Sequence, residues 1–194
     1  MSETILRCID KLLDAAAPVL KVAALSGKDW YRKPKGARHG PWLQSKFEVL
    51  DEKLWKRREP CIYFVKDGAG VFRYVGISLN RMKDRWRTSP SYDQDGTKLS
   101  TDELFHSQCW PHMTKHARDG GLLTYAVSVL HGAGLLKALT ALDHEISVLA
   151  KLAKDPEIVV TAMELWICKY GHATLWNATL TGGKNPRALR VVDG

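Results

Sequence analysis

Long hydrophobic runs are missing from this sequence. None approaches the roughly 20 apolar residues that a membrane-spanning helix needs, so we expect no membrane partner. The first ten residues, MSETILRCID, include acidic side chains and lack the pattern of a signal peptide. We therefore expect the chain to remain in the cytoplasm unless another route exports it.

Cysteine is also scarce, and its pattern excludes one class of site. The chain has four cysteines, and none belongs to a CxxC pair. Such scattered residues are typical of buried or free thiols in a reducing compartment, and they argue against a zinc site. The four positions are Cys8, Cys61, Cys109 and Cys168.

Negative charge is in short supply over the first half of the chain. The net charge is +8, and residues 56–90 hold nine Lys or Arg against three Asp or Glu. Residues 21–46 hold seven against one, whereas residues 91–194 hold ten against eleven. A clustered basic excess indicates a polyanionic partner, because charge that only maintains solubility would be spread more evenly.

What the sequence does contain is a strong hairpin signal at 61–77. Two apolar and β-branched runs flank the sequence Asp67-Gly68-Ala69-Gly70, which favours a tight turn. The stretch Arg81–Arg87 then reads as a helix start with four basic residues. A hairpin of this kind can bring Tyr63 and Tyr74 together, with arginines close by.

Phenol hydroxyls beside guanidinium groups suit a phosphodiester substrate. Arginine offers a forked and permanently charged set of donors, and a nearby cation makes a phenol lose its proton more easily. The alternative is a surface hairpin with aromatic cross-strand pairs and a solvated basic helix. The residue chemistry alone leaves both interpretations open.

The same stretch resembles the GIY-YIG nuclease superfamily. The first motif stands as Cys61-Ile62-Tyr63 and the second as Tyr74-Val75-Gly76, with the tyrosines eleven positions apart. The pair Arg85-Trp86 follows. Further on, the chain has Glu164-Leu165-Trp166-Ile167 and then Leu175-Trp176-Asn177. The matched segments span Cys61 to Gly183, with gaps between them.

This resemblance implies a metal-dependent DNA endonuclease. It makes Tyr63 the candidate general base and Tyr74 a residue that orients water or contacts the phosphate. It makes Arg85 the ligand of the scissile phosphate, Glu164 the ligand of one Mg²⁺ or Mn²⁺ ion, and Asn177 a residue that shapes the site or contacts the phosphate. The expected partner is double-stranded DNA, and a homodimer is an open alternative.

The sequence departs from the family pattern in several places. Cys61 stands where the first motif usually opens with glycine. One extra residue separates Tyr74 from Arg85, which leaves Arg81 as an alternative. The histidine that often follows the helix arginine is absent, and Ser89 stands near its place. Glu145 is a rival metal ligand, although it lacks the following Leu-Trp-Asn.

The segment from Ser26 to Pro41 interleaves basic and aromatic residues. It holds five Lys or Arg with Trp30, Tyr31 and three glycines, so composition favours a loop. Such a segment suits a nucleic-acid backbone, and a solvated connector is the alternative. The residues expected to contact nucleic acid are Lys33, Lys35, Arg38, Arg73, Arg81 and Arg87.

The remaining pattern predicts further helices and one strand. Helical spacing is present in Glu3–Leu20, Trp42–Trp55, Gly134–Lys154 and Glu157–Tyr170, and Gly121–Leu130 is the best remaining strand. His112 and His116 share one helical face. No Glu stands beside His112, so this is no metalloprotease motif, and we favour surface histidines over a metal pair or a role at the phosphate.

The predicted fold is α/β in the α+β sense, with a small, mostly antiparallel three-stranded sheet flanked by helices. Residues 1–56 are expected to form an N-terminal helical and basic extension, and residues 57–194 the nuclease-like domain. A stand-alone type II restriction enzyme fits, because no separate DNA-binding module is visible. The alternatives are a homing, repair or toxin nuclease, or a non-catalytic nucleic-acid-binding module.

Overall fold

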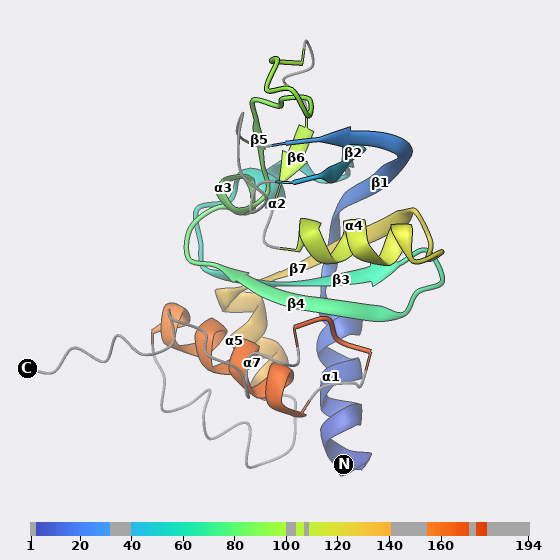
Figure 1. Cartoon of the computed structure of the whole chain (residues 1–194). Helices are drawn as coiled ribbons and strands as arrows, with labels where there is room; N and C mark the ends of the chain where they lie inside the picture. The colour runs from blue at the N-terminus through green and yellow to red at the C-terminus, as the bar shows by residue number, and fades with distance from the viewer. Residues whose placement is uncertain are drawn as a thin grey trace, which may run out of the picture.

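The computed structural model describes residues 3–31, 40–99, 104–106, 109–140, 155–170 and 174–177. It is an α+β structure in which helices flank an antiparallel sheet (Figure 1). In chain order the elements are α1 (Glu3–Ala15), β1 (Ala17–Trp30), β2 (Trp42–Val49), α2 (Glu52–Lys56), β3 (Cys61–Asp67), β4 (Phe72–Ser78), α3 (Met82–Arg85), β5 (Arg87–Ser89), β6 (Leu104–His106), α4 (Trp110–Arg118), β7 (Thr124–His131), α5 (Gly132–Thr140) and α7 (Pro156–Tyr170).

Five strands form the main sheet, in the spatial order β2-β1-β7-β3-β4. Every neighbouring pair is antiparallel. The three strands that the sequence predicted, β3, β4 and β7, lie together on one side of this sheet. Strands β1 and β2 extend it beyond them, so the sheet is larger than predicted. Strands β5 and β6 form a separate antiparallel pair.

The hairpin of β3 and β4 closes at the predicted turn. Oδ1 of Asp67 accepts hydrogen bonds from the backbone N–H groups of Ala69 and Val71, each at 3.0 Å. Gly70 has a φ of +80°, a left-handed conformation that glycine adopts without a side-chain clash. The hydrogen bonds of Asp67 and the backbone conformation of Gly70 therefore place the turn at the same residues.

The N-terminal part of the chain differs from the predicted helical extension. The expected helix is present, but it ends at Ala15, and β1 begins at Ala17. The predicted loop from Ser26 is strand as far as Trp30, and residues 32–39 lie outside the described ranges. The stretch Trp42–Trp55 was expected to be helical, but its first eight residues form β2. Because β1 pairs with both β2 and β7, residues before position 56 share one sheet with later ones.

The physical reason for this difference is an ambiguous spacing. Leu43 and Phe47 are four positions apart, which places them on one face of a helix and equally on one face of a strand. In the structure Leu43 and Ser45 are buried while Lys46 is exposed, which is the alternation of a strand. Helix α2 starts only after Asp51, whose Oδ1 accepts hydrogen bonds from the N–H groups at the helix start.

Different helices cover the two faces of the sheet (Figure 1). One face, here called the tyrosine face, carries Tyr63 and Tyr74 and packs against α2, α3 and α4. The opposite face carries Ile62, Phe64 and Val75 and packs against α1, α5 and α7. The long C-terminal helix predicted at Glu157–Tyr170 is confirmed as α7. Within the described ranges, no helix has the length and hydrophobicity needed to cross a bilayer.

Candidate active site

The two predicted catalytic tyrosines lie beside each other on the hairpin. In the register of β3 and β4, Tyr63 is opposite Gly76 and Tyr74 is opposite Val65. Residues two apart along a strand share a face, so both tyrosines point to the same side of the sheet. Their rings are stacked, with centroids 6.2 Å apart and planes 21° apart. Both side chains are buried.

Gly76 makes room for the hydroxyl group of Tyr63. A Cβ atom at position 76 would lie 2.4 Å from the hydroxyl oxygen and 2.5 Å from Cζ of Tyr63. Non-bonded atoms do not approach so closely, so any larger residue would displace the ring. The glycine of the second motif therefore determines where the tyrosine of the first motif lies.

Arg85 lies in α3, the short helix after β4, and its guanidinium is beside the hydroxyl of Tyr63. The alternative Arg81 faces elsewhere. Its Nε and Nη2 atoms each donate to the carboxylate of Asp84 at 2.9 Å. The buried side chain of Met82 holds the helix against the sheet. The structure thus brings Arg85, and not Arg81, to the tyrosine pair.

The phenols of the pair are harder to ionise than free tyrosine. Burial raises the pKa of Tyr63, and the positive charge of Arg85 offsets only part of this effect. Burial also raises the pKa of Tyr74, and the neighbouring Tyr63 adds to it. The sequence predicted that cations would lower the phenol's pKa. Arg85 acts in that direction, but the loss of water outweighs it. Both phenols therefore keep their protons at neutral pH.

Glu164 reaches the same cluster from α7. Its carboxylate interacts electrostatically with Arg85 and with both tyrosines. Met163 and Ile167 are buried and fix α7 to the opposite face of the sheet. Helix α7 is in contact with β4, the edge strand of the main sheet. The cluster therefore draws on β3, β4, α3 and α7.

The environment of Glu164 fits a bound cation. Burial raises its pKa from 4.5 to about 7, and Arg85 opposes only part of this rise. A nearby cation would stabilise the charged carboxylate. Within the described residues, no group of three or more His, Cys, Asp or Glu side chains is placed to hold a metal. Glu164 could hold Mg²⁺ here, because that ion keeps several waters and is usually bound through only one or two carboxylates.

Asn177 holds the edge of the sheet. Its Nδ2 atom donates to the carbonyl oxygen of Val75 at 2.6 Å, and its Oδ1 accepts from the N–H of Val75 at 3.4 Å. The N–H of Trp176 donates to the carbonyl oxygen of Arg73 at 2.7 Å. These bonds pair residues 174–177 with the free edge of β4. The side chain of Asn177 therefore shapes the site through the backbone beside Tyr74.

The arginines expected to contact nucleic acid are partly engaged in ion pairs. Nε of Arg73 lies 2.8 Å from a carboxylate oxygen of Asp67, and Arg81 pairs with Asp84. Arg87 is in β5, and its side chain is outside the described part of the chain. Four residues singled out from the sequence also lie outside the described ranges, namely Lys33, Lys35, Arg38 and Glu145.

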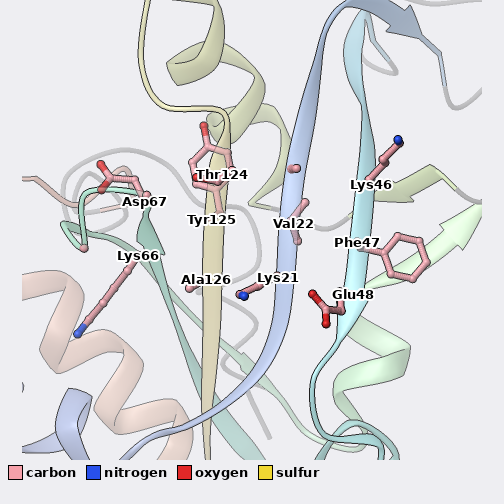
Figure 2. A pocket seen from close by; sticks show the side chains of 13 residues that line it. Lys21, Val22, Lys46, Phe47, Glu48, Lys66, Asp67, Thr124, Tyr125 and Ala126 are labelled. Carbon is pink, nitrogen blue, oxygen red and sulfur yellow. The ribbon is translucent and has the colours of Figure 1, made fainter.

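A hollow of about 630 Å³ lies over β2, β1, β7 and β3, with Lys21, Lys46 and Lys66 in its lining (Figure 2). Lys21 is opposite Glu48 on one neighbouring strand and opposite Ala126 on the other, and Lys66 is also opposite Ala126. These positions belong to the face opposite the tyrosines. Sequence reasoning missed these lysines as a group, because they are far apart along the chain.

Helix α4 brings two histidines over the tyrosine face. The ring centroid of His112 is 5.9 Å from that of Tyr74 and 6.2 Å from that of Trp176. Nδ1 of His116 lies 3.2 Å from the hydroxyl oxygen of Tyr125. Both imidazoles are half-buried, so they are less exposed than the surface histidines that the sequence predicted. Their spacing showed that they share a helix face, but not that this face packs on the sheet.

Comparison of the chain with protein-family models, with curated proteins and with solved structures found no match.

Proposed function

We propose that this protein is a metal-dependent endonuclease that hydrolyses phosphodiester bonds in double-stranded DNA. One observation carries the proposal. Four residues that resemble the GIY-YIG motifs, Tyr63, Tyr74, Arg85 and Glu164, interact with one another although they come from four elements. A purely structural cluster would not require two phenols, a guanidinium and a carboxylate in one buried place, because burying each of these groups costs free energy.

Each residue has a definite task in such a reaction. Arg85 binds the scissile phosphate and offsets the charge that develops in the transition state. The protonated hydroxyls of Tyr63 and Tyr74 donate hydrogen bonds to phosphate oxygens or to the attacking water. Glu164 holds the cation, which when bound would polarise the phosphate and offset negative charge on its oxygens. Asn177 keeps the edge of β4 in place.

The lysines around the hollow support a polyanionic partner. The lining holds three lysines, Lys21, Lys46 and Lys66, against the two acids Glu48 and Asp67, so it is net positive by one charge. If they contact the DNA backbone, replacing all three with Ala should weaken binding and reduce the salt slope by up to about 0.9 log units per lost phosphate contact. A matched control replaces exposed lysines on helices, namely Lys53, Lys137 and Lys169. An unchanged salt slope in the first variant would remove the hollow from the binding surface.

The biological role that we propose is restriction, with DNA recognised by loops and helices around the catalytic sheet. Homing, repair and toxin nucleases use the same chemistry and remain alternatives. A non-catalytic nucleic-acid-binding module is the second candidate function. The raised pKa values of Tyr63 and Tyr74 favour it, because these phenols are poor bases. Such a module would bind DNA and leave it intact in Mg²⁺.

The test is cleavage of supercoiled plasmid in Mg²⁺ or in chelator. We expect the parental protein to nick or linearise plasmid only with the cation. Glu164→Ala should abolish cleavage and retain DNA binding, since the basic surface is unchanged. Glu157→Ala, an exposed position on the same helix, is the matched control and should cleave normally. Cleavage in chelator, or by Glu164→Ala, would contradict the assignment of Glu164.

A further inference from the structure

The imidazole of His112 lies between the tyrosine pair and residues 174–177, here called the edge segment. It is tilted by 42° against the ring of Tyr74 and stacked at 13° against the ring of Trp176. These contacts fix the ring from two sides, since one partner belongs to β4 and the other to residues 174–177. Cys109, just before α4, interacts electrostatically with both Tyr63 and Tyr74. The start of α4 therefore lies over the cluster.

Hydrolysis of a phosphodiester requires a group that accepts a proton from the attacking water. The described neighbours of the cluster differ in their fitness for this task. Tyr63 and Tyr74 hold their protons because burial raises their pKa values, and the same holds for the thiol of Cys109. The guanidinium of Arg85 is a permanent cation. The carboxylate of Glu164 is already assigned to the proposed cation, so it would not be free to take the proton.

His112 differs from all of these groups. Burial lowers the pKa of its imidazole below the ordinary value of 6.5, and the charge of Lys115 lowers it further. The ring is therefore neutral at physiological pH and has one nitrogen lone pair available. A neutral imidazole fixed against Tyr74 is the described group best suited to take up a proton beside the cluster.

We propose that His112 is the general base of the reaction and accepts a proton from the water that attacks phosphorus. This inference rests on the proposed nuclease function. The O–H bond of the water breaks, its proton forms an N–H bond on His112, and the water oxygen forms a bond to phosphorus. The bond between phosphorus and the leaving ester oxygen breaks with its electron pair, and that oxygen takes a proton from solvent. The imidazolium then returns its proton to solvent.

The groups that face His112 determine its pKa, and therefore the pH at which its imidazole becomes protonated. Tyr74 faces it from β4, and Trp176 from the edge segment. Lys115 and His116 belong to its own helix, and His116 is directed toward Tyr125. The positive charge of Lys115 favours the neutral imidazole. Where Mg²⁺ keeps Glu164 ionised, the cleavage rate should thus fall at acidic pH, as His112 becomes protonated.

The experiment is single-turnover cleavage of a defined duplex across the acid range, at Mg²⁺ concentrations that saturate the protein and so keep Glu164 ionised. His112→Ala should cleave roughly 10²- to 10⁴-fold more slowly than the parental protein. Added imidazole should restore part of the rate, and the acid limb of the pH profile should disappear. His116→Ala, one turn further along the same helix, is the matched control and should keep the parental acid limb. Circular dichroism checks that each variant is folded.

Several results would overturn the inference. One is His112→Ala cleaving at the parental rate. Another is that His112→Ala cleaves slowly, is not rescued by added imidazole, and keeps the acid limb of the parental pH profile. If His112→Ala does not fold, the parental protein decides the matter, because NMR titration of His112 must give the same pKa as its acid limb. A parental protein that never cleaves DNA would refute the proposed function and this inference together.

Discussion

Replacing Glu164 with glutamine should change how stability depends on pH. The pKa of Glu164 is raised from 4.5 to about 7 in the folded protein, so the folded state binds more protons between these values than the unfolded state. The free energy of unfolding therefore falls as pH rises from about 4.5 through 7. At 1.36 kcal/mol per pKa unit, the contribution of this carboxyl group falls by about 3 kcal/mol.

Glutamine cannot ionise, so the variant should lack this part of the pH dependence. In chelator at pH 8, Glu164→Gln should be more stable than the parental protein by up to about 3 kcal/mol. Mg²⁺ at ten times its dissociation constant should stabilise the parental protein by about 1.4 kcal/mol and leave the variant unchanged. Urea unfolding, followed by tryptophan fluorescence at pH 5 and pH 8, measures both effects. Equal pH slopes in the two proteins would refute the reasoning.

Two further predictions concern residues that position the cluster. Gly76→Ala should destabilise the protein by about 1–3 kcal/mol, because its methyl group would overlap the Tyr63 hydroxyl; Gly134→Ala, with ordinary contacts, is the control. Asn177→Ala should cost about 1–3 kcal/mol, because it leaves the buried backbone groups of Val75 without their partners. Denaturant unfolding measures both losses, and a Gly76→Ala or Asn177→Ala variant as stable as the parental protein would contradict its assignment.

Local signals in the sequence were sufficient for the central part of the fold. The turn at Asp67-Gly68-Ala69-Gly70 and its flanking strands fix the hairpin, and strand alternation then puts Tyr63 and Tyr74 on one face. These features depend on residues close together in the chain. The proximity of Glu164 to the hairpin came from the motif resemblance instead, because no local rule shows that α7 packs against the edge strand.

The remaining features depend on contacts between distant segments. Strand β2 was mistaken for a helix because Leu43 and Phe47 fit both periods. The burial that reverses the expected pKa shift of Tyr63 comes from packing of the whole tyrosine face. His112 joins the site only because α4 folds back over the sheet. Such placements follow from tertiary packing, which the spacing of residues along one segment does not encode.

Cleavage by arginine variants tests the central claim most directly. Arg85→Ala should slow single-turnover cleavage of a defined duplex by roughly 10²- to 10³-fold, because it removes a charged donor from the scissile phosphate. Arg85→Lys should also be slow, since it keeps the charge but loses the fork. Arg81→Ala, which breaks only the ion pair with Asp84, should cleave at nearly the parental rate. Parental cleavage by Arg85→Ala, or a defect confined to Arg81→Ala, would contradict the account.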